Sequence, residues 1–266
     1  TNHVSKLSAA TLTGFKTTPP VMGDLPAAQG SDPVSRIFYD RDGRVIGGLD
    51  AEGYLSQIIY DGAGQKVSET RFATITSTSL RASGSFNALL ASVGTSSRDR
   101  SVHYVYDGQG LLRYQIDSLN QVTGFFYQNY FARPATTVAY AAAISATTDY
   151  SYDNIKSLVG AIASSSDDRK TWIVYDSAGR VAYTIDAGSA VTGFSYDSMG
   201  QVTRTIAYKQ LRGTTSLPSL ATMNSWSSSH IGDSENRITR TYYNARGELR
   251  YSVDAAGYVT RNDYNS

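Results

Sequence analysis

Apolar and polar residues alternate in short runs along most of this chain, and a turn follows each run. In "FYDRDGRVIGGLDAEGYLSQIIYDGAGQKV", which begins at Phe38, an Asp is followed three residues later by Gly three times, at Asp40, Asp50 and Asp61. Asp accepts hydrogen bonds from backbone amides of its own turn, and Gly adopts the left-handed conformation that closes a hairpin. The six or seven residues between turns make one ordinary strand. The pattern predicts an antiparallel meander of β-hairpins.

The residues that precede each turn alternate with the period of a strand. Counting back from a turn, the first and third residues are apolar or aromatic, as in Ile116 and Tyr114 or Tyr196 and Phe194, and a polar residue such as Gln115 lies between them. A period of two indicates that one face of a sheet is buried. We therefore expect tyrosines and β-branched residues to line one side of the sheet and to pack across strands.

The hairpin block recurs along the chain. Segments that begin at Val105, Val174 and Tyr242 repeat it, and in each copy two flanking tyrosines lie 21 residues apart. The leading tyrosines Tyr39, Tyr106, Tyr175 and Tyr243 are separated by 67, 69 and 68 residues. Internal repeats of this length are typical of repeat architectures in which neighbouring units stack. We predict a mainly β fold whose hairpin repeats, of about 68 residues each, form a curved or superhelical sheet.

The repeat spacing also predicts the domain organisation. A tandem array covers residues 32–266, with units that start near residues 32, 99, 168 and 236. Residues 1–31 are expected to be the tail of a preceding unit or a linker.

Segments between the hairpin blocks have a helical period instead. Apolar residues follow the spacing i, i+3, i+4, i+7 at Phe86, Leu89, Leu90 and Val93, and again at Ile155, Leu158, Val159 and Ile162. A third, less regular copy contains Leu217, Leu220, Met223 and Trp226. The sequence therefore predicts one short helix per unit. Pro134 lies in the least regular connection, and a proline there favours an edge strand or a loop.

The blocks that begin with Tyr-Asp resemble a known repeat. "YDRDGRV" from Tyr39, "YDGQGLL" from Tyr106, "YDSAGRV" from Tyr175 and "YDSMGQV" from Tyr196 are similar to the YD repeat of the RHS family. That family includes bacterial polymorphic toxins, the C component of insecticidal toxin complexes and the animal teneurins. The residues expected to be structural are Tyr39, Asp40, Gly43, Tyr60, Asp61, Gly64, Tyr106, Asp107, Gly110, Tyr175, Asp176, Gly179, Tyr196, Asp197, Gly200, Tyr243 and Gly247.

The resemblance implies long sheets of hairpins that spiral into a superhelix or a hollow shell. In toxins of the family the shell encloses a C-terminal effector, whereas in surface proteins the array is an extracellular stalk or recognition module. The expected partners are therefore neighbouring repeats of a longer chain, and either an enclosed toxin domain or a glycan or protein receptor. The expected location is secreted or on the bacterial cell surface.

Composition narrows the classes of partner. The chain has 24 basic and 23 acidic residues, so its charge would attract neither nucleic acid nor an anionic membrane. It contains no Cys, which excludes disulfides and thiolate metal sites, and no apolar run is long enough to be inserted into a membrane. Tyr is unusually frequent, at 20 copies against 8 Phe, as suits half-buried strands.

Candidate catalytic and metal sites were weighed against structural roles. The three histidines, His3, His103 and His230, lie in unrelated contexts, so the sequence predicts neither a zinc site nor a catalytic relay. Calcium binding by turns such as Asp40 with Asp42 lacks the ligand spacing of calcium-binding repeats. Acids on repeated turns do not converge as a glycosidase requires. We expect no enzymatic activity, no cofactor and no metal.

The sequence leaves two functions open. The leading one is a structural scaffold in a large secreted or surface bacterial protein, with a share in a shell that encloses a toxin. The alternative is an adhesin module that binds a carbohydrate or a receptor. For that alternative, exposed aromatic rings at Tyr54, Phe126, Tyr242 and Tyr258 are the candidates to stack on sugars, although packing within strands is the favoured explanation of each ring.

Overall fold

The computed structural model describes residues 35–128, 132–163 and 165–264, and in these residues the chain forms fifteen strands and four helices. The strands are β1 (Arg36–Tyr39), β2 (Val45–Leu49), β3 (Tyr54–Tyr60), β4 (Lys66–Ile75), β5 (Arg100–Tyr106), β6 (Leu112–Ile116), β7 (Val122–Tyr127), β8 (Pro134–Ala139), β9 (Arg169–Tyr175), β10 (Val181–Ile185), β11 (Val191–Tyr196), β12 (Val202–Ala207), β13 (Arg237–Tyr243), β14 (Leu249–Val253) and β15 (Val259–Arg261). The helices are α2 (Thr78–Arg81), α3 (Phe86–Val93), α4 (Tyr152–Gly160) and α5 (Leu220–His230).

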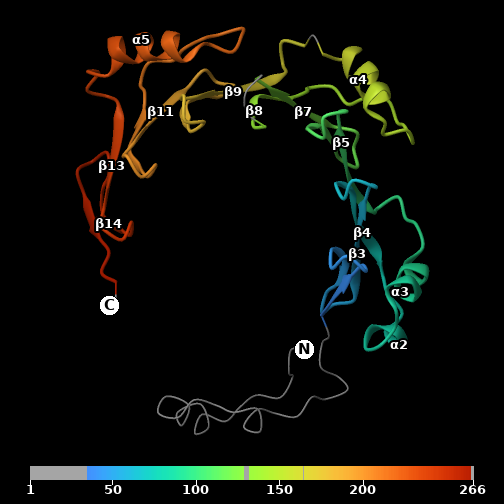
Figure 1. The fold of residues 1–266 in the computed structure, drawn as a ribbon. Helices are drawn as coiled ribbons and strands as arrows, with labels where there is room; N and C mark the ends of the chain where they lie inside the picture. Colours follow the sequence, from blue (N-terminus) through green and yellow to red (C-terminus); the bar gives the residue numbers. More distant parts are fainter. Residues whose placement is uncertain (1–34, 129–131, 164, 265–266) are drawn as a thin grey trace, which may run out of the picture. The chain divides into compact units, whose positions relative to one another are not determined.

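The chain divides into two compact units. Among the described residues, the first contains those up to Tyr104 together with Ile116–Leu119, and the second contains Val105–Gln115 and those from Asn120 onward. Within each unit the strands are antiparallel, and strands that are neighbours in the chain are neighbours in the sheet (Figure 1). This order confirms the predicted mainly β fold of antiparallel hairpins. The expected tail or linker at residues 1–31 lies outside the described residues.

Because successive strands are antiparallel, alternate turns lie at opposite ends of the strands. We call one end the tyrosine edge: its turns begin at Asp40, Asp61, Asp107, Asp176, Asp197 and Asn244, each directly after a tyrosine. We call the other end the insert edge: its turns begin at Asp50, Asp117, Asp186 and Asp254, each after an aliphatic residue. The connections that carry the helices also leave and rejoin the strands at the insert edge.

Apolar residues occupy both faces of the strands. In the second unit one face carries a core of Trp172, Val174, Ile185, Val191, Ile206, Tyr208 and Met223, the last of which belongs to α5. Ile185 pairs with Val191 on this face, whereas the register places Phe194 and Tyr196 on the opposite face. The prediction of a single apolar side was therefore wrong. Counting back from every turn mixed the two edges, and the residues before them point to different faces.

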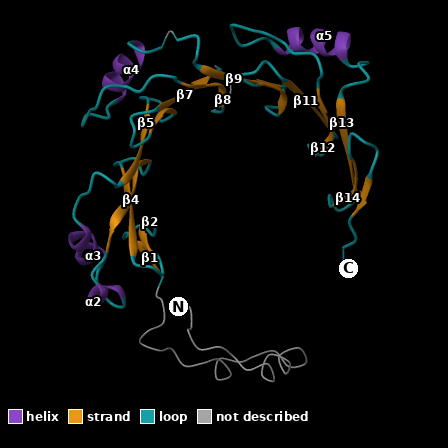
Figure 2. Cartoon of the chain, turned by 180° about the vertical axis from the view of Figure 1, so that it is seen from behind, coloured by secondary structure: helices purple, strands orange, loops and turns teal. Residues whose placement is uncertain are grey.

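The helices cover one of these faces. Figures 1 and 2 show α3 beside the strands of the first unit, and α4 and α5 on one side of the strands of the second. Leu89 and Val93 of α3 are buried against a core that includes Leu49 and Leu55 of the sheet. The predicted helix in each insert is confirmed, including the less regular third copy, which forms α5. The short helix α2 follows no pattern that the sequence analysis identified.

Two of the helices begin with the same cap. The hydroxyl of Ser85 accepts a hydrogen bond from the Ala88 amide at 3.2 Å, and the hydroxyl of Ser219 accepts one from the Thr222 amide at 3.1 Å. A serine at this position satisfies an amide that has no partner within the helix. Helices α3 and α5 therefore begin in the same way, although their sequences differ.

Pro134 lies in an interior strand, which corrects the prediction of an edge strand or a loop. Strand β8 pairs with β7 on one side and with β9 on the other. Pro134 is its first residue and faces Tyr127 where the register shifts. A proline is tolerated at the first residue of a strand or at a bulge, where its missing amide breaks no regular pair.

Two insert-edge turns replace the fourth-position glycine with a larger residue. Asn120 has a φ of 60° and Ser189 has a φ of 68°, whereas the corresponding Gly53 has a φ of 99°. A residue with a Cβ atom is strained in this conformation, and Asn tolerates it better than Ser does.

We therefore expect Ser189→Gly to raise the free energy of unfolding, by about 1 kcal/mol. Urea denaturation followed by circular dichroism measures the change. Ala187→Gly, in the same turn but without a left-handed φ, serves as the control and is expected to lower stability slightly. Equal effects of the two substitutions would contradict the assignment of strain to Ser189.

Candidate functional site

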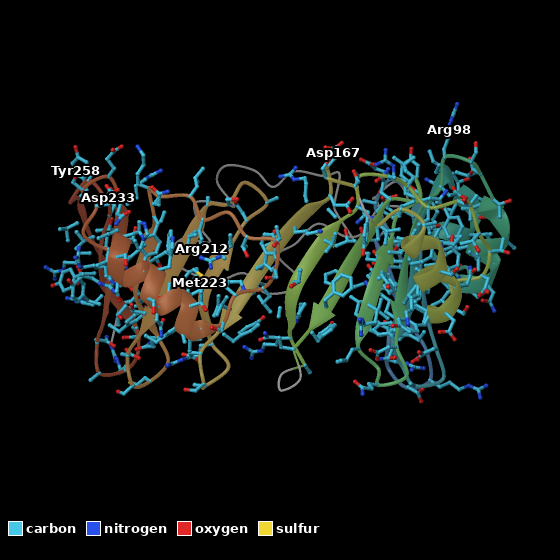
Figure 3. All side chains as sticks on the ribbon, turned by 90° about the horizontal axis from the view of Figure 1, so that it is seen from above. Arg98, Asp167, Arg212, Met223, Asp233 and Tyr258 are labelled. Atoms are coloured by element: carbon cyan, nitrogen blue, oxygen red, sulfur yellow. The ribbon has the colours of Figure 1, made fainter. Side chains whose placement is uncertain are left out.

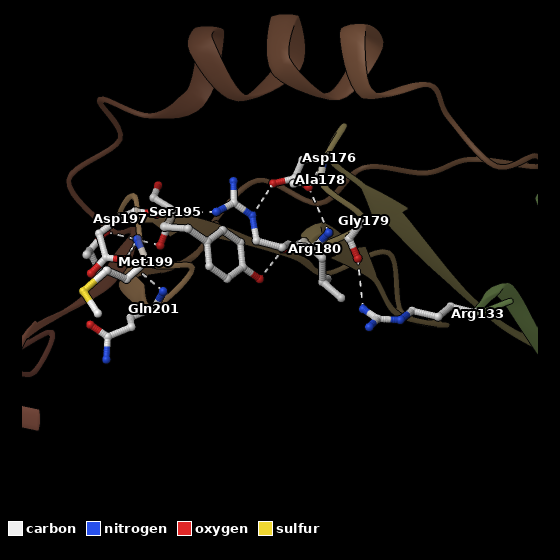
Figure 4. A network of polar contacts seen from close by, with 12 residues as sticks. Arg133, Asp176, Ala178, Gly179, Arg180, Ser195, Asp197, Met199 and Gln201 are labelled. Atoms are coloured by element: carbon white, nitrogen blue, oxygen red, sulfur yellow. Dashed lines mark hydrogen bonds and ion pairs between the residues drawn. The ribbon is translucent and has the colours of Figure 1, made fainter. Parts of the chain in front are cut away.

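The turns of the tyrosine edge are the most regular polar feature of the chain, and the turn at Asp176 shows their geometry (Figure 4). Oδ1 of Asp176 accepts hydrogen bonds from the amides of Ala178 and Arg180, both at 2.9 Å. The Gly179 amide donates to the Asp176 carbonyl at 3.0 Å, and Gly179 has a φ of 74°. One carboxylate thus organises the whole turn, and glycine closes it.

The same arrangement recurs at the other positions that the sequence singled out. Carboxylates that accept from the amides two and four residues ahead belong to Asp40, Asp61, Asp107 and Asp197, and the side-chain carbonyl of Asn244 does the same. The glycines of these turns, Gly43, Gly64, Gly110, Gly200 and Gly247, all have φ values between 77° and 81°. These residues therefore serve the backbone of their own turns.

Arginine completes two of the turns. Nε of Arg180 lies 2.8 Å from Oδ2 of Asp176, and Nε of Arg44 lies 2.7 Å from Oδ2 of Asp40. Hydrogen bonding by the Arg44 amide, aided by its guanidinium, lowers the pKa of Asp40. Partial burial acts to raise the pKa of Asp176, but the hydrogen bonds from Arg180 outweigh it, so this pKa is also lowered. Both carboxylates therefore stay ionised at neutral pH, engaged within their own turns.

The tyrosines of this edge connect neighbouring strands. The phenol of Tyr196 on β11 donates to the carbonyl of Val181, the first residue of β10, at 2.8 Å. Similar bonds join Tyr60 to Val45, Tyr127 to Leu112, Tyr175 to Pro134, Tyr243 to Val202 and Tyr264 to Leu249, at 2.9–3.1 Å. In each pair the acceptor is the first residue of a strand after a tyrosine-edge connection. The register shows a bulge that disrupts the regular ladder at the acceptors Val45, Pro134, Val181, Val202 and Leu249. The phenol thus satisfies a carbonyl beside the bulge.

We expect Tyr196→Phe to lower the free energy of unfolding by about 1 kcal/mol, because the half-buried Val181 carbonyl loses its phenol donor while the ring remains. Tyr242→Phe is the matched control, because Tyr242 is 49% exposed and removal of its hydroxyl should have an effect within about 0.5 kcal/mol. Urea denaturation of both variants makes the comparison. A Tyr196→Phe variant as stable as the control would exclude a structural role for this bond.

Consecutive tyrosine-edge turns are also bonded to one another, a feature that the sequence analysis missed. Arg133 donates to the Gly179 carbonyl at 3.0 Å, and Arg180 makes a long contact of 3.5 Å to the Asp197 carbonyl (Figure 4). Gln201 donates to the Gly247 carbonyl at 2.7 Å. Each donor directly precedes the strand that follows its own connection. The sequence signal is a long donor side chain at this position, visible as Arg44, Gln65, Arg180 and Gln201.

A further repeated contact closes the inserts at the insert edge. Oδ1 of Asp99 accepts from the Ala73 amide at 2.8 Å, and Oδ1 of Asp168 accepts from the Ala141 amide at 2.9 Å. In the third insert Oδ1 of Asn236 accepts from the Lys209 amide at 2.9 Å. These side chains join the last residue before a returning strand to the segment where the insert leaves the sheet.

Burial of Tyr140 at the start of an insert makes the stability of the fold depend on pH. Burial raises the pKa of Tyr140 to about 12, and the ring of Tyr140 packs closely over Gly124. The neutral phenol is therefore favoured in the folded state. Stability from this group is complete below pH 10, where the unfolded phenol starts to ionise, and is lost as the pH rises toward 12.

The pKa of the Tyr140 phenol is higher in the folded chain than in the unfolded chain. For this residue alone, the difference lowers the free energy of unfolding by about 1.4 kcal/mol when the pH is raised from about 9 to about 11. We expect Tyr140→Phe to lose less stability than the parent chain over this interval, by about that amount. Urea midpoints measured at pH 9 and pH 11 provide the test. Parallel pH profiles of the two proteins would contradict the assignment.

The four aromatic residues proposed for ligand stacking do not form one site. Tyr54 lies in the first unit, in a hollow of about 570 Å³ whose lining includes Arg36, Asp50 and Arg71. In the second unit Phe126 lies 5.7 Å from the Arg113 guanidinium, and Tyr258 is 76% exposed at the margin of the strands (Figure 3). Tyr242 on β13 faces Tyr251 on β14.

The described residues show no converging catalytic or metal-binding groups. No cluster of three or more His, Asp or Glu with the geometry of a metal site occurs among them. Burial lowers the pKa of His103, and the ring of His230 stacks on Trp226 at the end of α5. His3 lies outside this part of the chain. Among the helices of the same residues, none has the length and apolar character needed to cross a membrane.

Comparison with known families supports the resemblance. Residues 85–209 match the family model described as Teneurin YD-shell. The match confirms that these repeats resemble the YD repeat of the RHS family, as the Tyr-Asp blocks indicate. No curated protein matches the chain.

Several solved structures match this chain at low identity. The crystal structure of TcdB2-TccC3-Cdc42 is 14% identical, covers 87% of this chain and has a TM-score of 0.48. TcdB2-TccC3 without its hypervariable C-terminal region is also 14% identical, covers 89% and has a TM-score of 0.49. A mutant Tc holotoxin pore of Photorhabdus luminescens is 14% identical, covers 85% and has a TM-score of 0.45. This chain spans about a tenth of the length of each of these matched chains.

Proposed function

We propose that this chain is a non-catalytic structural segment of a YD-repeat shell in a secreted or surface bacterial protein. The observation that carries the proposal is the tyrosine edge, where phenols bond the carbonyls of adjacent strands and side chains bond from one turn to the next. The polar groups of the tyrosine edge therefore form hydrogen bonds that hold neighbouring strands and turns together. The match to a family model described as a YD-shell supports the same role.

In this proposal the neighbouring repeats of a longer chain continue the wall, and the wall encloses a polypeptide such as a toxin domain. The near-neutral balance of charge, 24 basic against 23 acidic residues, fits a wall that does not bind nucleic acid. Within the second unit α5 covers one face of the strands, and the opposite face carries Tyr196 and threonines such as Thr205 and Thr239.

Electron microscopy of the protein purified at its natural length from its source cells tests this function. We expect a hollow particle with a thin wall, and protease treatment that leaves an internal domain intact until the particle is opened by denaturant. A solid particle, or an internal domain cut as fast as the wall, would refute enclosure.

The alternative function is carbohydrate or receptor binding at the hollow beside Tyr54, where an aromatic ring lies next to charged side chains. Under this alternative, a glycan array would give saturable binding that Tyr54→Ala abolishes and Tyr258→Ala leaves unchanged.

A further inference from the structure

The helix-covered face of β13–β15 carries apolar residues that the described part of the chain leaves uncovered. Tyr242 is 49% exposed, Tyr251 is 37% exposed and Val259 is 64% exposed, and Val253 is half-buried. Tyr242 pairs with Tyr251, and Val253 pairs with Val259. Tyr251 and Val253 are two residues apart on β14, so the four side chains form one patch on the same face. We call this patch the open face.

The register shows that the open face lies on the side that the helices cover. Ile238 of β13 pairs with Ile206 and packs against the core that contains Met223 of α5. Residues two apart on a strand point to the same face, which places Tyr242 on the side of Ile238. Thr260, the neighbour of Val259 on β15, points to the opposite face and pairs with Ser252.

The preceding repeat shows what covers the same positions. Tyr242, Tyr251, Val253 and Val259 correspond in register to Val174, Tyr183, Ile185 and Val191. In that repeat Val174 is 4% exposed, Ile185 is fully buried and Val191 is 1% exposed, all in one core with Met223 of α5. The phenol of Tyr183 donates to Oδ1 of Asn224, also on α5, at 3.1 Å.

The first repeat gives an independent second example. Leu49 and Leu55 take the positions of Val253 and Val259, are 2% and 1% exposed, and pack in one core with Leu89 and Val93 of α3. Two helices of different sequence thus bury the same pair of sheet positions.

We infer that the open face is the docking site of an amphipathic helix of the same kind as α3 and α5. Its buried stripe would supply two residues spaced i, i+4 to Val253 and Val259, and a polar residue would accept from the phenol of Tyr251. The source that we assign is the insert of a further YD repeat. The inference names a partner for the proposed scaffold and rests on that function, but its test does not require a hollow particle.

Disulfide trapping tests the inference cleanly, because the chain has no cysteine of its own. The probe is a synthetic peptide of residues 216–232, which contains α5, with Met223→Cys. The protein carries Val259→Cys on the open face or, as the matched control, Thr260→Cys on the opposite face. Disulfide trapping captures a complex that forms in only a small fraction of the molecules. This sensitivity is needed because a short isolated peptide is only partly helical in water. Reactivity of each protein thiol toward a small disulfide reagent normalises the rates, and circular dichroism verifies that both variants are folded.

We expect the normalised rate of cross-linking to be at least tenfold higher for Val259→Cys than for Thr260→Cys. Replacing Leu220 and Trp226 of the peptide with Asp should remove the difference. Equal rates at the two positions, or no loss with the polar peptide, would overturn the inference. Disulfide-linked dimers of the Val259→Cys protein that form faster than its peptide adduct would also overturn it, because a second copy would then be the preferred occupant. If the natural particle proved solid but the peptide still cross-linked efficiently to Val259→Cys, the proposed shell function would be refuted and the helix-docking inference would stand.

Discussion

Replacing Ile185 with alanine is expected to lower the free energy of unfolding by about 2–5 kcal/mol, the largest single effect that the structure predicts. Ile185 is fully buried in the core that joins β9–β12 to α5, so truncation removes apolar contacts and leaves a cavity. The loss should be concentrated in one region, since stability in a repeat array is carried by each unit and its immediate neighbours. Hydrogen exchange should therefore increase most in α5 and β10.

Ile185→Val is the matched control and should cost about 0.5–1.5 kcal/mol. Urea denaturation gives both values. A loss below 1 kcal/mol for the alanine variant would mean that α5 does not hold this position closed, and an increase in exchange confined to the first unit would contradict a local effect.

Asp176→Ala is expected to cost about 3 kcal/mol, because two amide hydrogen bonds to an ionised carboxylate and its ion pair with Arg180 are lost together. The natural turn at Asn244 supplies the control. Its side-chain carbonyl accepts from the amides of Arg246 and Glu248 in the same geometry, so Asp176→Asn should retain the turn and cost less than about 1 kcal/mol.

Thermal and urea denaturation of the two Asp176 variants measure the difference. Equal destabilisation by Ala and Asn would show that charge, and not the acceptor geometry of the turn, holds this position. The outcome also separates the structural role of the carboxylate from an ion-binding role, because removal of calcium with a chelator should change neither value.

The order of strands could be predicted from the sequence because the information is local. An Asp that organises its own turn and a Gly with a positive φ fix each hairpin within five residues, as at Asp176 and Gly179. Connections this short leave antiparallel neighbours as the only arrangement. The helices could also be predicted from the sequence, because the spacing of Leu89 and Val93 indicates the face that the helix buries.

The contacts of the tyrosine edge could not be predicted because they join residues distant in sequence. Arg133 and Gly179 are 46 residues apart, as are Gln201 and Gly247, and their contact depends on the register of the strands between them. The assignment of faces failed for a related reason. Tyr196 and Ile185 both precede a turn, but the turns lie at opposite edges, and only the paired register shows that the two side chains point to different faces.

The insert edge carries a practical consequence for protein engineering. Its helices have different sequences and lengths, from 4 residues in α2 to 11 in α5. Each insert is nevertheless closed by one side chain, such as Asp99 or Asn236, that bonds the backbone where the insert leaves the sheet. A foreign peptide grafted between such a closing residue and the residue whose amide donates to it would leave the hairpin turns intact. Each repeat thereby offers a separately exchangeable site for displaying a chosen sequence at the insert edge of its own strands.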